Sequence, residues 1–387
     1  MGQGAEVGAV AAAPTIRRRR AAASPSTRWR QAATSAKTAG MSTLAPPPWR
    51  LSGELPLRIE PAGADRSVAT LCAELGQHEA WCRQALQAHG ALRFRGFEVR
   101  GPEDFEGVAR AIDPALKKDY LGTSPRDAVT EYVFNASELP DFYPIAAHCE
   151  MSFCAHPPAH LFFCALTAPA EGSGETPLCD FRKVWRDLPA DLRQRFLDGG
   201  IRHVRNYAAP GTRTDAVQLK PWDDMFQTRD HAVVEAKCRE EGFEAVWLEG
   251  GGLRLLSTQP VFRRHPVTGE VAWHNHLTTF HTTSSVGEYQ QIVAKRPTDR
   301  HRGVLEMARA LEEKLLSTPP DERSMHTTHV DGSEIPRADV EAVRDVIWQH
   351  TVFDPWVEGD VVAIDNFAVA HGRMPYEGPR RIVACWA

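Results

Sequence analysis

The chain has 387 residues, of which 42% are hydrophobic and 25% charged, and this balance can bury a substantial core. No apolar run approaches the roughly 20 residues that a membrane-spanning helix needs, so we expect no membrane partner. The formal net charge is -5 and there is no dense basic stripe, which argues against a nucleic-acid partner. The 8 cysteines form no CxxC pair, which is typical of reduced thiols in an intracellular protein.

The first 50 residues differ in composition from the rest. They are rich in Ala, Arg, Ser and Thr, carry a single acidic residue, Glu6, and lack an apolar stretch. This composition is typical of a transit peptide for a mitochondrion or a plastid. The alternative is a disordered leader, or translation that begins at Met41, in a cytoplasmic protein. We therefore predict a leader over 1–50 and one domain over 51–387.

The remaining elements follow from hydrophobic periodicity, with helical spacing of apolar residues in some segments and alternation in others. The segment 205–300 has short apolar runs and turn signals, which indicate strands with a long insertion. In chain order we predict a helix over 65–88, a strand over 91–97, a helix over 102–112, a strand over 161–166, a helix over 181–197 interrupted near Pro189, helices over 303–316 and 337–349, a strand from Asp360, a turn at His371-Gly372 and a last strand over 380–386.

His148 and Glu150 are the first two residues with a clear chemical pattern. In a β-strand, residues i and i+2 project to the same face, so both side chains can enter one cavity while Cys149 faces the other way. One histidine and one carboxylate arranged in this way are two of the ligands of a 2-His-1-carboxylate metal site.

His371 supplies the second histidine. It follows a largely apolar run that predicts a buried strand, and Gly372 permits an unusual backbone turn directly after it. Arg381 lies ten residues further on, where a returning antiparallel strand would bring its guanidinium near His371. A guanidinium can bind a carboxylate through two parallel hydrogen bonds. Arg380 alternates to the opposite face and is the weaker candidate.

Three ligands leave open positions on one side of a metal, which suits iron that must also hold a cosubstrate and dioxygen. A zinc hydrolase could use the same two histidines and glutamate with a bound water. It would leave Arg381 unexplained. A third possibility is a binding protein without catalytic activity, in which the ligand set is accidental.

Several further segments resemble the taurine dioxygenase (TauD/TfdA) family of Fe(II)- and 2-oxoglutarate-dependent oxygenases, in particular the branch similar to clavaminate synthase and syringomycin-type hydroxylases. They occur in family order from about residue 55 to the end of the chain. Each is loose alone, and their combination is specific. The matching segments are 90–97, 121–126, 148–153, 174–180, 265–270, 331–336 and 359–381.

The resemblance implies a mainly β fold with flanking helices, a double-stranded β-helix or jelly roll. It implies that His148, Glu150 and His371 ligate Fe(II), and that Arg381 and Thr176 bind the distal carboxylate of 2-oxoglutarate. The family often has another basic residue four positions after this arginine, whereas Cys385 stands there in this chain. The implied reaction consumes O2 and releases succinate and CO2 as a C–H bond is hydroxylated.

The substrate is the least defined part of the prediction. The branch acts mostly on small polar molecules, so we expect an amino-acid-like substrate, with hydroxylation as the main outcome and desaturation or ring closure as alternatives. Arg126 and Asn275 are candidate substrate contacts by their place in the matching motifs. One or two of the histidines at 274, 276 and 281 are expected to line the cavity. The oligomeric state is not defined by these features.

Overall fold

The computed structural model describes residues 47–387 except 119, 121–126, 215–218 and 320–321. The described residues belong to one compact unit. Most of the predicted leader lies outside them, so the transit peptide and the boundary after residue 50 stay predictions. Within the described ranges no helix has both the length and the apolar character needed to cross a membrane.

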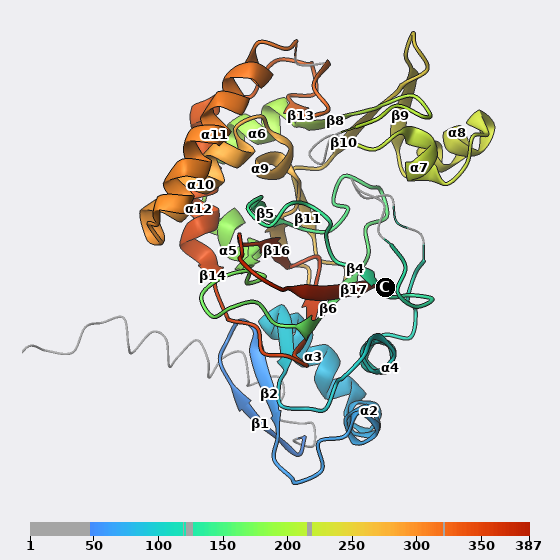
Figure 1. Cartoon of the computed structure of the whole chain (residues 1–387), viewed down its shortest axis with the longest axis vertical. Coiled ribbons are helices and arrows are strands. Elements are labelled where there is room, and N and C mark those ends of the chain that lie inside the picture. The colour runs from blue at the N-terminus through green and yellow to red at the C-terminus, as the bar shows by residue number, and fades with distance from the viewer. Residues whose placement is uncertain (1–46, 119, 121–126, 215–218, 320–321) are drawn as a thin grey trace, which may run out of the picture. The chain divides into compact units, whose positions relative to one another are not determined.

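The largest sheet has seven strands in the order β1-β2-β3-β15-β6-β17-β4 (Figure 1). All neighbours are antiparallel except the parallel pair β2 and β3. Its centre is apolar and buried, as the sequence predicts for the segment 161–166. The strands are β1 (Trp49–Ser52), β2 (Leu57–Pro61), β3 (Ala91–Phe94), β4 (Phe134–Asn135), β6 (His160–Thr167), β15 (Val361–Asp365) and β17 (Arg381–Trp386).

A second, four-stranded antiparallel sheet has the order β14-β7-β16-β5. Its strands are β5 (Ile145–His148), β7 (Leu178–Asp180), β14 (Thr351–Val352) and β16 (Val369–Arg373). Side chains from both sheets meet in one apolar cluster, which includes Phe163 and Ile364 of the large sheet and Leu178 and Val369 of the small one. The main core therefore lies between the two sheets.

The segment between β7 and β14 contains a further sheet with the order β13-β8-β10-β9 and the hairpin β11-β12. The strands β8 to β12 account for the short apolar runs that the sequence shows over 205–300. The strands of the whole segment are β8 (Ile201–Tyr207), β9 (Phe243–Trp247), β10 (Leu253–Gln259), β11 (Phe262–Arg264), β12 (Val271–Trp273) and β13 (Met325–Thr328).

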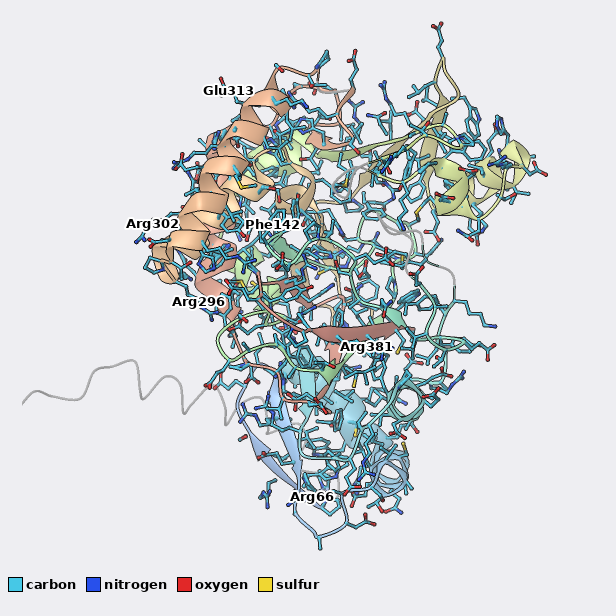
Figure 2. All side chains as sticks on the ribbon, in the orientation of Figure 1. Arg66, Phe142, Arg296, Arg302, Glu313 and Arg381 are labelled. Atoms are coloured by element: carbon cyan, nitrogen blue, oxygen red, sulfur yellow. The ribbon has the colours of Figure 1, made fainter. Side chains whose placement is uncertain are left out.

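The helices flank the sheets, and α10, α11 and α12 lie alongside one another (Figure 1). Charged side chains such as Arg302 and Glu313 project from α11 (Figure 2), as an amphipathic surface helix requires. The helices are α2 (Val68–Gln77), α3 (Glu79–His89), α4 (Pro102–Ile112), α5 (Phe181–Asp187), α6 (Ala190–Gly199), α7 (Trp222–Phe226), α8 (His231–Glu240), α9 (Leu277–Phe280), α10 (Ser284–Lys295), α11 (Asp299–Leu316) and α12 (Arg337–His350).

Two local predictions need correction. The helix expected over 65–88 is divided into α2 and α3 at His78, and Gly90 caps α3 in the left-handed conformation, with φ of 80°. The turn expected at His371-Gly372 is absent, because both residues lie within β16. Gly372 has another role: a Cβ atom there would lie 2.5 Å from the Ile145 carbonyl oxygen, so glycine allows β16 to approach β5.

Candidate active site

The two candidate histidines lie opposite each other on neighbouring strands. His148 ends β5, His371 lies in β16, and the two residues are paired in the strand register. Their ring centroids are 4.5 Å apart. His148 Nδ1 is 2.9 Å from the Ala146 carbonyl oxygen, to which it can donate. This hydrogen bond selects the tautomer in which Nε2 carries the lone pair that a metal ligand needs.

Glu150 reaches the histidines from a turn and not from the predicted strand. β5 ends at His148, and Met151 after Glu150 has a φ of 50°, which is uncommon for a residue other than glycine. The Glu150 Oε2 atom lies 3.8 Å from His371 Nε2. Tyr120 donates a hydrogen bond from its hydroxyl to Glu150 Oε1 at 3.3 Å. The alternation expected of a strand therefore does not apply to Glu150, because this residue lies beyond the end of β5.

The donor set fits a divalent iron ion. His148, Glu150 and His371 are all buried, and one ligand atom from each lies within 4.8 Å of the other two. Two imidazoles and one carboxylate on neighbouring positions are the facial triad that non-haem Fe(II) oxygenases use. The short distances between their ligand atoms make these three residues the candidate metal centre within the described part of the chain.

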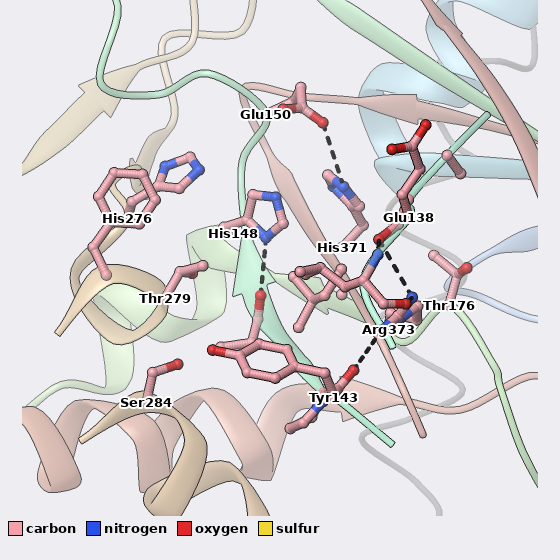
Figure 3. A pocket seen from close by; sticks show the side chains of 18 of the residues that line it. Glu138, Tyr143, His148, Glu150, Thr176, His276, Thr279, Ser284, His371 and Arg373 are labelled. Atoms are coloured by element: carbon pink, nitrogen blue, oxygen red, sulfur yellow. Dashed lines mark hydrogen bonds and ion pairs between the residues drawn. The ribbon is translucent and has the colours of Figure 1, made fainter. Parts of the chain in front are cut away.

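A cavity opens in front of this group (Figure 3). Thr176 and Arg373 lie on one side of the three candidate ligands, and His276, Thr279 and Ser284 lie on the other. Apolar side chains cover much of the remaining wall and limit access of water. They include Leu139, Ile145, Phe153, Phe163, Leu219, Phe280, Met325 and Ile382.

Arg380 lines this cavity and Arg381 does not, so the prediction of Arg381 needs correction. The Arg381 side chain is exposed and is not part of the cavity wall. Side chains alternate along a strand, and Ile382 of β17 faces the cavity. Arg380 directly precedes β17, two positions before Ile382, and lines the same cavity. The ten-residue spacing from His371 assigned Arg381 and not Arg380 to the cavity face, because spacing alone does not fix which face of a strand meets the cavity.

Arg380 is held by few contacts. Its Nε donates to the Gly174 carbonyl oxygen at 2.9 Å, its guanidinium lies 5.3 Å from the Tyr376 ring centroid, and it forms no ion pair with a carboxylate of the described residues. Burial lowers the pKa of Arg380 to about 10, and the charge of Arg373 adds to this effect. The guanidinium remains protonated at neutral pH and suits an anionic ligand.

Arg373 also lines the cavity, although no sequence motif predicted a role for it. Its two terminal nitrogens donate to the carbonyl oxygens of Leu139, Pro140 and Tyr143 at 2.9, 2.6 and 2.7 Å. Burial lowers its pKa. These contacts show that Arg373 holds the segment 139–143 against the cavity. Its position two residues after His371, on the same strand face, was the signal that could have found it.

Thr176 is buried and lines the cavity, as the resemblance implies. Its hydroxyl oxygen accepts a hydrogen bond from Trp356 Nε1 at 3.2 Å. The hydroxyl proton remains available to a ligand in the cavity.

The candidate substrate contacts have different outcomes. Asn275 is buried outside the cavity wall, where its amide donates to the Val261 carbonyl oxygen and accepts from the Leu277 backbone N–H. This prediction therefore needs correction, because the side chain orders the backbone before α9. His276 does line the cavity, whereas the other two histidines near it do not. Arg126 lies outside the described residues.

A second group, His281, His326 and Glu334, also has ligand atoms within 4.8 Å of one another. Arg323 Nη1 lies 3.0 Å from both His326 Nε2 and Glu334 Oε1. A guanidinium in that position opposes a cation, so we assign no metal to this group.

The fold and the candidate metal centre together define an oxidoreductase of the iron- and 2-oxoglutarate-dependent dioxygenase class. Residues 54–386 match the model of the taurine catabolism dioxygenase TauD, TfdA family. The chain belongs to this family, which confirms the predicted enzyme class and cofactors. A zinc hydrolase and a binding protein without activity are thereby disfavoured.

Two relatives have similar levels of identity. The dapdiamide synthesis protein DdaC of Enterobacter agglomerans is 28% identical over 299 residues, which is 77% of this chain and 82% of that protein. The clavaminate synthase-like protein At3g21360 of Arabidopsis thaliana is 28% identical over 303 residues, with the same coverage. The crystal structure of PvcB from Pseudomonas aeruginosa aligns with a TM-score of 0.48 and 14% identity, covering 89% of this chain and 92% of that one. That similarity adds nothing to the family assignment.

Proposed function

We propose that this protein hydroxylates a C–H bond of a small polar, amino-acid-like molecule, with 2-oxoglutarate and O2 as cosubstrates. The observation that carries the proposal is the buried group of His148, Glu150 and His371 at a cavity that Arg380 and Thr176 also line. The first three residues would hold Fe(II), and the last two would bind 2-oxoglutarate.

Iron bound there would supply the redox chemistry by which 2-oxoglutarate and O2 oxidise the substrate. The two-electron oxidation of 2-oxoglutarate to succinate and CO2, and that of C–H to C–OH, together balance the four-electron reduction of O2. The protein contributes by holding the reactants. The buried ligand group and the apolar wall keep water away from the centre, which strengthens electrostatic contacts in the cavity.

Arg380 is our candidate for the distal carboxylate of 2-oxoglutarate, in place of Arg381. Arg380 is half-buried, and a partly desolvated cation without a carboxylate partner among the described residues is stabilised by an anionic ligand. Its terminal guanidinium nitrogens can form two parallel hydrogen bonds with a carboxylate. The Thr176 hydroxyl can add a third donor. Each side chain makes one hydrogen bond to the protein, Arg380 to the Gly174 carbonyl oxygen and Thr176 with Trp356, which helps to orient it toward a ligand.

We further propose that the two main sheets are the faces of a double-stranded β-helix. Successive strands alternate between them: β5 and β7 belong to the small sheet and β6 to the large one, and β15 and β17 belong to the large sheet and β16 to the small one. Such alternation is what a two-sheet jelly roll requires. The ligand-bearing β5 and β16 are neighbours in the small sheet.

The side of the cavity formed by His276, Thr279 and Ser284 is our candidate for the substrate site. Its polar side chains are uncharged at neutral pH, because burial lowers the pKa of His276 well below the usual value. Apolar neighbours such as Phe153 and Phe280 suit the carbon skeleton of a small substrate. DdaC is by its name a protein of dapdiamide synthesis, which supports a small-molecule substrate.

The direct test is an anaerobic titration of the purified protein with Fe(II) and 2-oxoglutarate. We expect a weak visible charge-transfer band, and we expect His371→Ala to remove it. A screen of small amino acids and betaines for stimulated succinate formation then identifies the substrate class. A folded wild-type protein that binds neither Fe(II) nor 2-oxoglutarate would overturn the proposal.

A further inference from the structure

The side chain of Asn366 contacts the backbone of the candidate ligand Glu150 on both sides. Asn366 Oδ1 accepts a hydrogen bond from the Glu150 backbone N–H at 2.7 Å, and Asn366 Nδ2 donates to the Glu150 carbonyl oxygen at 3.0 Å. Nδ2 also donates to the Pro158 carbonyl oxygen at 2.9 Å. Asn366 is completely buried, and the two residues are 216 positions apart in the sequence.

Only the amide of asparagine matches this arrangement. The Glu150 N–H needs an acceptor, and the two carbonyl oxygens need donors, so the orientation of the amide is fixed by its neighbours. An aspartate would retain the acceptor and would place a buried carboxylate against two carbonyl oxygens. An alanine would leave the backbone groups of Glu150 without these contacts, which is costly in a buried position.

The turn that carries Glu150 needs such support. His148 and His371 are fixed by the pairing of β5 with β16, whereas Glu150 lies beyond the end of β5. The next residue, Met151, has a positive φ of 50°, a conformation that side-chain-bearing residues rarely adopt without support from their surroundings. The position of the carboxylate therefore depends on contacts outside the strand ladder.

Asn366 is well placed to provide this support. It lies in the short connection between β15 and β16, five residues before His371, and its backbone N–H donates to the Ala159 carbonyl oxygen at 3.0 Å. The connection between the two sheets, which leads into the strand of one candidate ligand, thus holds the turn that carries another. We propose that Asn366 is a positioning residue of the metal centre, which sets the Glu150 carboxylate against the two histidines. This inference rests on the proposed function of the three residues as metal ligands.

The test compares Asn366→Ala and Asn366→Asp with Asn275→Ala. Asn275 is a matched control because it is also buried and its amide also contacts backbone groups on two sides, but none of these belongs to a candidate ligand. The Kd for Co(II) alone is measured by absorbance with metal-free protein, and thermal unfolding of each variant is recorded in parallel. We expect both Asn366 variants to bind Co(II) about 10- to 100-fold more weakly than wild type, the usual effect of removing an outer-shell contact. Asn275→Ala is expected to lose stability and to keep the wild-type Kd.

A second measurement needs no metal. Amide hydrogen exchange at Glu150 reports directly on the backbone N–H that donates a hydrogen bond to Asn366 Oδ1. We expect this amide to exchange faster in Asn366→Ala, while the exchange rates of amides in β5 and β16 stay unchanged. If Asn366→Ala does not fold, the Co(II) Kd of Asn366→Asp carries the test. A wild-type Co(II) Kd in a folded Asn366 variant would overturn the inference. Absence of Co(II) binding by wild-type protein would instead overturn the proposed metal centre.

Discussion

The guanidinium groups of Arg373 and Arg380 are two positive charges on the same cavity wall, and their contacts give them different roles. Arg373 donates to three backbone carbonyl oxygens. Arg380 donates from Nε to one carbonyl oxygen, and that is its only hydrogen bond within the described part of the chain. The first arginine therefore stabilises the wall, and the second is the better candidate for binding an anion.

The pair Arg380 and Arg381 offers a controlled test, since the residues are adjacent and only one faces the cavity. We expect Arg380→Ala to raise the Kd for 2-oxoglutarate by about 10- to 100-fold, because a hydrogen bond to a charged group contributes about 1.5–3 kcal/mol. Arg381→Ala is expected to bind 2-oxoglutarate as wild type does. The Kd is measured by anaerobic titration of the charge-transfer band. Weakened binding in Arg381→Ala alone would reverse our assignment.

His274 predicts a dependence of stability on pH. Burial lowers its pKa in the folded protein to about 3, from an ordinary value of 6.5. Between these values the unfolded chain binds more protons, so the free energy of unfolding falls as the pH falls below about 6.5. From pH 7 to pH 5.5 we expect His274 to account for a loss of about 1 kcal/mol.

Urea unfolding at both pH values measures this loss. His274→Leu removes the titrating group, and its stability should change less between the two pH values than that of wild type. An equal change in both proteins would show that His274 does not contribute.

At the scale of elements, the approach of β16 to β5 brings the two histidines together. Gly372 lies where the register between these strands shifts, and a Cβ atom there would meet the Ile145 carbonyl oxygen at 2.5 Å. Backbone atoms cannot move aside as easily as the end of a flexible side chain can. The small sheet therefore depends on the absence of a side chain at this position.

Gly372→Ala is expected to lower the free energy of unfolding by about 1–3 kcal/mol, the usual cost of overpacking. It should also weaken metal binding, because it separates the strands that carry the histidines. Gly303→Ala in α11 is the control, since no atom lies within 4 Å of the added Cβ. It should raise stability by about 0.5–1 kcal/mol. Urea unfolding and Co(II) titration measure both effects, and a fully stable Gly372→Ala would contradict the packing argument.

The helices were the most predictable elements. α4 begins at Pro102 and ends at Ile112 as expected, since proline in the first turn and the apolar spacing are local features. The position of the turn near His371 was not predictable in the same way. From the neighbouring sequence alone, a glycine predicts a turn. Gly372 is instead needed for the close approach of β16 to β5, a strand more than 200 positions earlier in the sequence.

At the scale of the whole molecule, the candidate metal ligands come from segments far apart in the sequence, so metal binding and folding are coupled. An ion that binds only the folded state stabilises it by about 2.7 kcal/mol at 100 times the Kd. We therefore expect Co(II) to raise the Tm of metal-free protein by several degrees, in a saturable manner.

His371→Ala should abolish this increase while the metal-free Tm changes little. The measurement is thermal unfolding followed by circular dichroism at increasing Co(II) concentrations. An identical increase in His371→Ala would place the bound ion elsewhere.

The sequence by itself determined the residue types that carry the chemistry, the family and most helices, because these depend on local spacing and on motifs within short segments. It identified His148, Glu150 and His371, and the structure brings them together. Only the tertiary structure decided that Arg380 and not Arg381 faces the cavity, that Asn275 lies outside it and that Asn366 holds Glu150. Each of these outcomes depends on how a strand or a turn packs against distant parts of the chain, and local periodicity does not contain that information.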